Sequence, residues 1–256
     1  MRVAVLGLGE AGWLYAGGLA ARGATVIAFD PAVSTAPAGV AVSSDAEEAV
    51  RAADVVASLV GASAAHAVGV AAFPAMRPAA VYADMNTAAP DDKRALAAEA
   101  AGADVLFADV AIMAPVPRAA ELTPLLVSGS GAELLAAEWG PLGIPLTSAG
   151  PDAGTAAGLK LLRSVFMKGL AALVFESVSA ADRLDAGDWI RAEIAAELGS
   201  EGSALVERLL TGTRQHAERR THEMEDVAAF LATLGTPAWM TDSTLRWLRA
   251  IAADEI

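Results

Sequence analysis

Short runs of apolar residues alternate with alanine-rich stretches of helical length through the first 150 residues of the chain. This alternation is typical of parallel strands joined by right-handed helical crossovers. The runs that we interpret as buried strands are residues 2–6, 25–29, 54–60, 80–85 and 104–110. Two later runs, 123–129 and 144–150, indicate added edge strands with a short helix between them.

The pattern changes after Gly150, where the β-rich runs stop. The remaining apolar positions recur at helical spacing, punctuated by Gly-Asp, Gly-Ser and Gly-Thr-Pro. This spacing predicts helices over residues 155–176, 189–198, 203–230 and 241–253. We therefore expect a Rossmann-type, doubly wound α/β domain over residues 1–152 and a smaller all-helical domain over residues 153–256, for substrate binding and dimerisation.

Composition and charge argue against several classes of partner and of site. The formal net charge of −13 argues against nucleic acid and anionic membrane surfaces as partners. No apolar run is long enough to span a membrane, and the first apolar run is short, broken by glycine and followed by Glu10, unlike a signal peptide. The absence of cysteine excludes disulfides and thiolate sites. We expect a cytoplasmic protein whose partner is a small molecule.

A glycine-rich turn follows the first predicted strand. Residues 7–12 read GLGEAG, which matches G-x-G-x-x-G, and they open a helical segment. Gly7 permits a tight turn, Gly9 allows a pyrophosphate to approach the backbone, and Gly12 lets the helix pack on the strand. Asp30 ends the next strand, where a carboxylate would bind ribose hydroxyls and repel a 2′-phosphate. The motif favours NAD, with NADP as the alternative.

Two of the three lysines lie in one apolar segment. Lys160, Ser164 and Lys168 follow one another at intervals of four residues and form a polar stripe. A buried lysine is costly unless it meets a partner or a wet cleft, so we expect the stripe to face the groove between the domains. A desolvated lysine can exchange a proton near neutral pH. The alternative is a lysine whose ammonium group reaches the surface of a helix bundle.

Together these features resemble the β-hydroxyacid dehydrogenase superfamily, which includes 3-hydroxyisobutyrate and 6-phosphogluconate dehydrogenases. The markers are the glycine turn, residues 84–87 (DMNT) followed by Pro90, residues 109–111 (DVA) followed by Pro115, and Gly154 shortly before Lys160. The resemblance implies that Lys160 is the catalytic acid/base and that residues 84–87 lie near nicotinamide and substrate.

The chain also departs from the family pattern. The substrate loop of the PVSGG form is replaced by residues 110–121, VAIMAPVPRAAE, and Arg163 and Ser164 stand where asparagine is common. With its short helical part, the chain resembles a poorly characterised branch that has been labelled as phosphogluconate dehydrogenases. Imine reductases of the same superfamily usually carry aspartate or tyrosine in place of Lys160, so the lysine favours a hydroxy acid or a related alcohol.

A late helical segment carries His216, Arg219, Arg220 and Glu223. One arginine can bind a substrate carboxylate or phosphate through its planar fork, but a solvated face with ion pairs is the preferred interpretation. His66 and His222 are isolated, with no second histidine or acid at ligand spacing, so we predict no metal site.

The sequence thus predicts an NAD(P)-dependent oxidoreductase that acts on the alcohol carbon of a small, anionic hydroxy acid and forms a homodimer. The alternatives are an imine reductase and a non-catalytic NAD-binding sensor. The residues assigned to the substrate are Asn86, Thr87, Ser164, Lys168, Arg219 and Arg220. The residues assigned to the cofactor are Gly7, Gly9, Glu10, Ala11, Gly12, Asp30, Val60 and Asn86.

Overall fold

The computed structural model of the chain describes residues 1–255. The chain divides into two compact units, Met1–Lys160 and Leu161–Ile256. The division falls inside one long helix, α6 (Thr155–Asp182), whereas the sequence places a boundary just before this helix. We describe each unit by itself.

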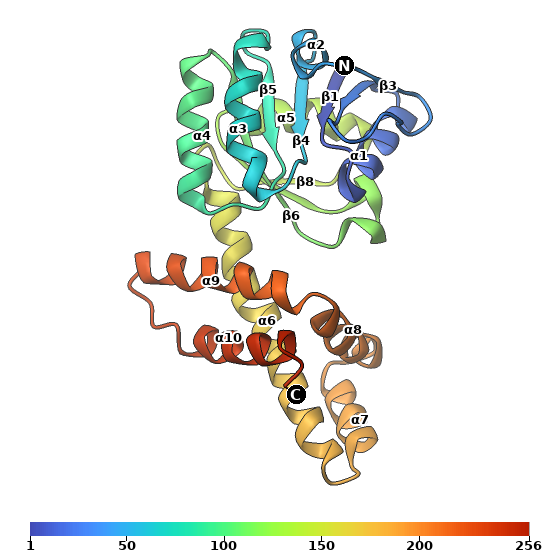
Figure 1. The fold of residues 1–256 in the computed structure, drawn as a ribbon, viewed down its shortest axis with the longest axis vertical. Helices are drawn as coiled ribbons and strands as arrows, with labels where there is room; N and C mark the ends of the chain where they lie inside the picture. The colour runs from blue at the N-terminus through green and yellow to red at the C-terminus, as the bar shows by residue number, and fades with distance from the viewer. Residues whose placement is uncertain (256) are drawn as a thin grey trace. The chain divides into compact units, whose positions relative to one another are not determined.

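The first unit is built on an eight-stranded sheet with the order β3-β2-β1-β4-β5-β6-β7-β8 (Figure 1). The strands are β1 (Arg2–Leu6), β2 (Thr25–Phe29), β3 (Val40–Val42), β4 (Val55–Ser58), β5 (Val81–Asp84), β6 (Leu106–Ile112), β7 (Leu125–Ser128) and β8 (Leu146–Ser148). All neighbours are parallel except β6 and β7, which pair antiparallel. The central strand β1 separates the two halves of the sheet, which confirms the Rossmann-type prediction.

Helices cover both faces of this sheet. They are α1 (Glu10–Ala21), α2 (Ala46–Arg51), α3 (Ala62–Ala72), α4 (Pro90–Gly102) and α5 (Ala132–Trp139), together with the short 3-10 turns η1 (Phe73–Ala75), η2 (Val116–Arg118), η3 (Ala120–Leu122) and η4 (Gly140–Leu142). Side chains of α1 and α5 form one core with one face of the strands. Side chains of α2, α3 and α4 form a second core with the other face. The central strands are therefore buried on both sides, as their continuous apolar runs predict.

All seven predicted strands are present, and the sequence missed only the three-residue strand β3. Residues 123–129 and 144–150 were both expected at an edge, but β7 lies between β6 and β8, so only the second of these two runs forms an edge strand.

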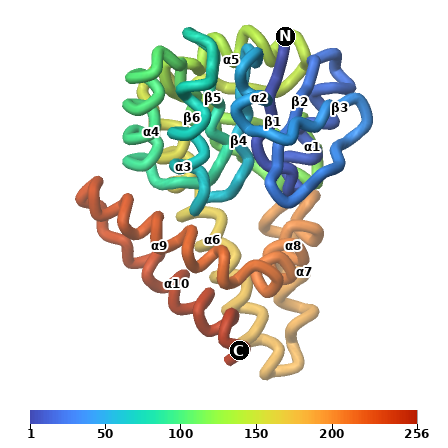
Figure 2. The backbone as a smooth tube through the Cα atoms, turned by 45° about the horizontal axis from the view of Figure 1, so that its top comes forward, coloured from blue at the N-terminus to red at the C-terminus, as the bar shows by residue number. Residues whose placement is uncertain are grey.

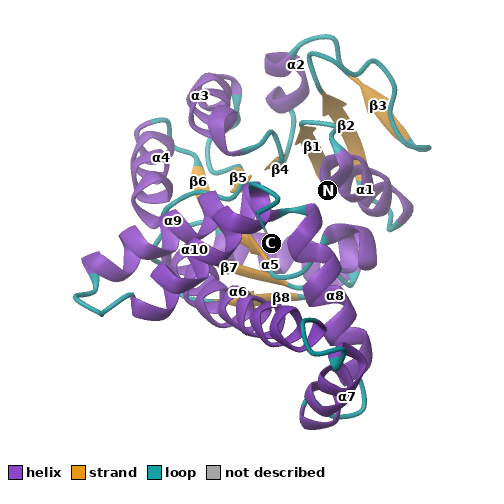
Figure 3. Ribbon diagram, turned by 60° about the horizontal axis from the view of Figure 1, so that its bottom comes forward, coloured by secondary structure: helices purple, strands orange, loops and turns teal. Residues whose placement is uncertain are grey.

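The second unit consists of helices throughout its described part (Figures 2 and 3). The later part of α6 is followed by α7 (Gly187–Glu197), α8 (Gly202–Gln215), α9 (Ala217–Thr233) and α10 (Trp239–Ala252). None of the helices within residues 1–255 combines the length and the hydropathy needed to cross a bilayer.

The prediction of one helix over residues 203–230 is wrong. His216 leaves the helical conformation with φ −127° and ψ 24°, and this break separates α8 from α9. Most buried side chains of the two helices belong to different apolar clusters, and only Leu210 and Ala217, close to the break, share a third. Val206 and Leu209 of α8 pack with the middle of α6, whereas Met224 and Val227 of α9 pack with α10. A straight helix would present one continuous stripe, so the break is what allows both clusters to form.

Both tyrosines of the chain are fully buried in the first unit. Tyr15 lies against Trp139, with ring centroids 6.4 Å apart, and Tyr82 lies between Phe73 and Phe107. Burial raises the pKa of both phenols because the apolar surroundings disfavour the phenolate.

These phenols make stability sensitive to alkaline pH. The folded chain holds both protons, whereas the unfolded chain releases them as the pH rises above the ordinary tyrosine pKa of about 10. Unfolding is therefore favoured as the pH rises further, by about 1.4 kcal/mol per pH unit for each phenol. Tyrosinate absorbance should appear only together with the loss of the native circular dichroism signal. The variant Tyr15→Phe/Tyr82→Phe should lose this contribution, and a tyrosinate signal from the folded chain would contradict the prediction.

Candidate functional site

The glycine turn follows β1 and leads into α1. Gly7 has a φ of +92°, and a Cβ at this position would lie 2.5 Å from the carbonyl oxygen of Leu59. A Cβ at Gly12 would lie 1.9 Å from the carbonyl oxygen of Gly7. Both positions therefore require glycine, because a side chain would collide with backbone that cannot move aside.

Gly9 is different, because a Cβ there would meet nothing within 4 Å. Gly9 is the N-cap residue of α1, it is exposed, and no side chain caps the helix. The first backbone N–H groups of a helix lack intrahelical acceptors and carry partial positive charge, so Glu10, Ala11 and their neighbours offer donors to an anion. The open space and the uncapped helix end fit the pyrophosphate of a dinucleotide.

Asp30 follows β2 and is bound to this turn. Its carboxylate accepts a hydrogen bond from the backbone N–H of Leu8 at 2.7 Å and another from that of Ala32 at 2.8 Å. Each carboxylate oxygen can accept more than one hydrogen bond, so Asp30 can still bind ribose hydroxyls. The sequence predicted that Asp30 binds ribose hydroxyls. It did not predict that Asp30 also orders the glycine turn.

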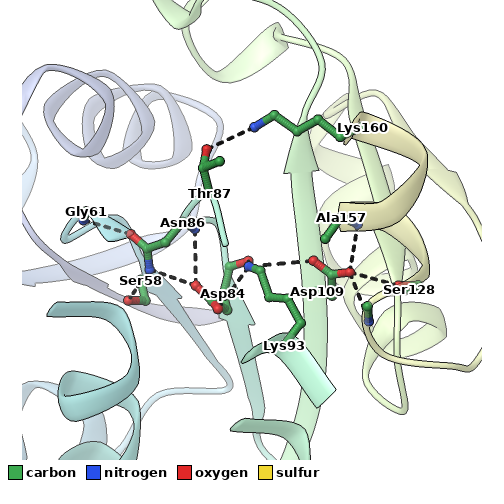
Figure 4. A network of polar contacts seen from close by, with 11 residues as sticks. Ser58, Gly61, Asp84, Asn86, Thr87, Lys93, Asp109, Ser128, Ala157 and Lys160 are labelled. Carbon is green, nitrogen blue, oxygen red and sulfur yellow. Dashed lines mark hydrogen bonds and ion pairs between the residues drawn. The ribbon is translucent and has the colours of Figure 1, made fainter. Parts of the chain in front are cut away.

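The turns after β4 and β5 are joined by the buried amide of Asn86. Its Nδ2 donates to Ser58 Oγ at 3.0 Å and to Asp84 Oδ1 at 2.7 Å, and its Oδ1 accepts from the backbone N–H of Gly61 at 2.9 Å (Figure 4). Asn86 thereby positions the segment after β4, which includes the half-buried Val60. Both amide donors are used within the chain, so Asn86 acts mainly as an organiser of the site.

The amine of Lys160 lies next to Thr87. Lys160 is half-buried in the part of α6 that belongs to the first unit, and its Nζ donates to the exposed Thr87 Oγ1 at 3.1 Å (Figure 4). Thr87 follows β5, which is separated from β1 by one strand. Because parallel strands have their carboxyl ends at the same edge of a sheet, the first unit places Thr87, its bound amine and the glycine turn at one edge.

A buried ionic network lies behind this edge. Lys93 on α4 is only 1% exposed, and its Nζ contacts Asp84 Oδ2 at 2.9 Å and Asp109 Oδ1 at 3.6 Å. Lys93 was not among the site residues predicted from the sequence. A signal was present, because Leu96 and Ala100 define the buried face of α4 and Lys93 lies on that face.

Asp109 also accepts hydrogen bonds from the backbone at the start of α6. Its Oδ2 accepts from the backbone N–H groups of Gly154 at 3.2 Å and Ala157 at 3.0 Å, and from Ser128 Oγ at 3.2 Å. Ser128 Oγ in turn accepts from the N–H of Ala156 at 3.0 Å. The amino end of α6 is thus capped by a carboxylate from β6, which complements the helix dipole.

The remaining predicted site residues lie in the second unit. Lys168 Nζ donates to the buried Ser164 Oγ at 3.1 Å and lies 2.9 Å from the carboxylate of Glu223. Glu223 also pairs with Arg219, at the i,i+4 spacing expected for a helix. The polar stripe is therefore divided, with Lys160 in the first unit and Ser164 and Lys168 in the second.

Arg220 occupies a more secluded position than Arg219. Its Nη1 donates to Thr213 Oγ1 at 2.6 Å. Burial lowers the pKa of the Arg220 guanidinium, although the carboxylate of Glu223 opposes this effect. No group of three or more His, Asp or Glu side chains within residues 1–255 is arranged to hold a metal ion.

Two family models match the chain. Residues 2–138 match the NAD binding domain of 6-phosphogluconate dehydrogenase. Residues 181–251 match a domain of unknown function, DUF1932. A curated relative is an uncharacterized 28.5 kDa protein in the 7S RNA 5′ region of Methanothermus fervidus. The two sequences are 27% identical over 151 residues, which make up 59% of this chain and 58% of the relative.

Solved structures extend the likeness over both units. A conserved hypothetical protein from Sinorhizobium meliloti is 32% identical, with a TM-score of 0.79 over 98% of this chain and 88% of that one. Two others share the fold. The 3-hydroxyisobutyrate dehydrogenase of Mycobacterium tuberculosis has 22% identity and a TM-score of 0.81, over 99% of this chain and 94% of that one. An imine reductase from Streptomyces aurantiacus has 22% identity and a TM-score of 0.62, over 99% and 95%.

The NAD-binding family model covers more than half of the chain, and its match includes the glycine turn and the residues that follow β5. The resemblance drawn from the sequence motifs is therefore confirmed. The chain belongs to the family of the NAD binding domain of 6-phosphogluconate dehydrogenase, within the β-hydroxyacid dehydrogenase superfamily.

Proposed function

We propose that this protein is an NAD(P)-dependent oxidoreductase that acts on the alcohol carbon of a small, anionic hydroxy acid, with Lys160 as the general acid/base. The observation that carries the proposal is the 3.1 Å contact between Lys160 Nζ and Thr87 Oγ1, at the sheet edge where the glycine turn lies. In a family of NAD-binding domains, this edge is where a dinucleotide binds.

In this proposal, different residues of the first unit bind the cofactor, transfer the proton and position the proton-transfer group. The uncapped start of α1 at Gly9 would hold the pyrophosphate, and Asp30 would bind the adenosine ribose. The bound nicotinamide would supply or accept the hydride. Lys160 would take the proton from the substrate hydroxyl during oxidation and return it during reduction. Thr87 would hold the amine in place, and Asn86 would hold the segment that carries Thr87.

The anionic group of the substrate requires a cation. We assign this role to the second unit, through Lys168 supported by Ser164 and through Arg219 or Arg220. Arginine suits a carboxylate or a phosphate because its donors form a planar fork. Lys168 and Arg219 both form an ion pair with the carboxylate of Glu223, so the two cations lie close to one another.

We also propose that the second unit forms a homodimer. It exposes large apolar side chains, among them Trp189 at 63% and Trp239 at 78%. Apolar surface of this kind in a small helical unit is typical of association with another chain.

A substrate panel tests the assignment. We expect turnover with 3-hydroxy acids or sugar acids in the presence of NAD or NADP, and none with cyclic imines. Turnover of imines would favour an imine reductase, an activity named for one structure that shares the fold. Cofactor binding without turnover of any compound would favour an NAD-binding sensor.

Replacing Lys160 separates chemistry from binding. Lys160→Ala should lower turnover by about a hundredfold to ten-thousandfold, because it removes the proton-transfer group. The dissociation constant for NAD should change little, because the cofactor contacts are assigned to the glycine turn and Asp30. Lys160→Arg is the matched variant. Arginine keeps the positive charge but does not release a proton at working pH, so it should not restore turnover. Equal losses of turnover and NAD affinity would contradict the assignment.

Asp30 governs the choice between NAD and NADP. Asp30→Asn removes the charge but keeps an acceptor for the N–H of Leu8, so we expect affinity for NADP to rise relative to NAD by about tenfold. Asp30→Ala should also weaken both cofactors, because the glycine turn loses the hydrogen bond from the N–H of Leu8 to the Asp30 carboxylate. Calorimetric titration of both cofactors measures the ratio. An unchanged ratio in both variants would refute the role of the charge.

A further inference from the structure

Lys93 is a buried charge that the proposed chemistry does not use. Its ammonium group makes a hydrogen bond to the backbone oxygen of Asp84 at 2.9 Å, an ion pair with Asp84 Oδ2 at 2.9 Å, and a longer contact with Asp109 Oδ1 at 3.6 Å. All three side chains are at most 2% exposed. Charges removed from water in this way are costly to separate, so the three groups constrain one another strongly.

Each carboxylate binds the segment that carries one of the two residues of the Lys160–Thr87 contact. The first is Asp84, whose Oδ1 accepts from both the backbone N–H and the Nδ2 of Asn86, the residue that immediately precedes Thr87. The position of Thr87 therefore depends on the orientation of Asp84.

The second carboxylate is Asp109. Its Oδ2 accepts from Gly154 and Ala157 at the start of α6, and Lys160 lies one turn further along the same helix. The register of Lys160 therefore depends on the position of Asp109. Lys93 lies between the two carboxylates, and it contacts neither Lys160 nor Thr87 through any of these bonds.

We propose that Lys93 is a positioning residue that holds the amine of Lys160 against Thr87, because it joins the carboxylate that orders the Asn86–Thr87 segment to the carboxylate that caps α6. Its value for turnover depends on the proposed function. The geometric role does not, because it concerns the contact between two side chains of the first unit.

The test removes the ammonium group without leaving two unbalanced carboxylates. Lys93→Met/Asp109→Asn keeps the net charge of the three groups, and the asparagine oxygen can still accept from Gly154 and Ala157. Asp109→Asn alone retains Lys93 but replaces the carboxylate oxygen that contacts it, so it breaks the same link from the Asp109 side. Lys93→Gln/Asp109→Asn, whose glutamine amide can donate to Asp84, is a second variant in case methionine is not tolerated.

The readout follows the Lys160 amine directly. The chain has only three lysines, so reductive methylation with carbon-13 formaldehyde gives few NMR signals. Lys160→Arg and Lys168→Arg assign them. A dimethylated amine keeps its charge and one N–H donor, so it can still bind Thr87. Thr87→Val shows how far the Lys160 signal moves when the contact is lost.

We expect the Lys160 signal of folded Lys93→Met/Asp109→Asn to move at least half as far as in Thr87→Val, and in the same direction. Adding Thr87→Val to this variant should move it little further, because the contact is already weakened. Asp109→Asn alone should move the signal in the same direction, because its amide N–H group replaces the oxygen that contacts Lys93. NAD affinity should stay within about threefold, since the glycine turn is untouched.

A Lys160 signal that stays in place in the folded variant, and still moves fully when Thr87→Val is added, would overturn the inference. Loss of the fold in both Lys93 variants would make Lys93 a folding determinant and would overturn it as well. Failure of the proposed function has a different signature. The unmodified protein would then turn over no substrate, while the coupling between Lys93 and the Lys160 signal would persist.

Discussion

The organising interaction of the first unit is the buried contact of one ammonium group with two carboxylates. Asp84 ends β5, Asp109 lies on β6, and Lys93 comes from α4, which connects these strands. A charge in this position cannot be left without partners, so strand ends, crossover helix and the start of α6 must all adopt their native register together. The positions of Thr87 and Lys160 at the sheet edge depend on this contact, because Asn86 and the first turn of α6 are bound to the same two carboxylates.

Much of the fold was accessible from the sequence because the dominant signals were local. Continuous apolar runs predicted the central strands, and the glycine spacing predicted the turn after β1. The break at His216 was not accessible, because it results from the packing of α8 and α9 into different clusters. The short strand β3 was missed because three residues carry too little pattern.

The site shows the same division. Gly7, Gly12 and Asp30 could be named because each occupies a fixed place in a known motif. The contact of Lys160 with Thr87 joins positions far apart in the chain, and only the resemblance to a family brought them together beforehand. Lys93 escaped notice because a lysine in a charged segment, DDKR, is usually a solvated residue. Its burial depends on Asp84 and Asp109, which lie on other elements.

The bond between Asp30 and the N–H of Leu8 has a thermodynamic consequence for ligand recognition. The carboxylate that is suited to the ribose also immobilises the loop that is suited to the pyrophosphate. Because this bond lies within the chain and restricts the conformations of the loop, less conformational entropy is lost on association. An anionic ligand can then be captured by an acidic protein through a small, rigid array of backbone dipoles rather than through a field of basic side chains.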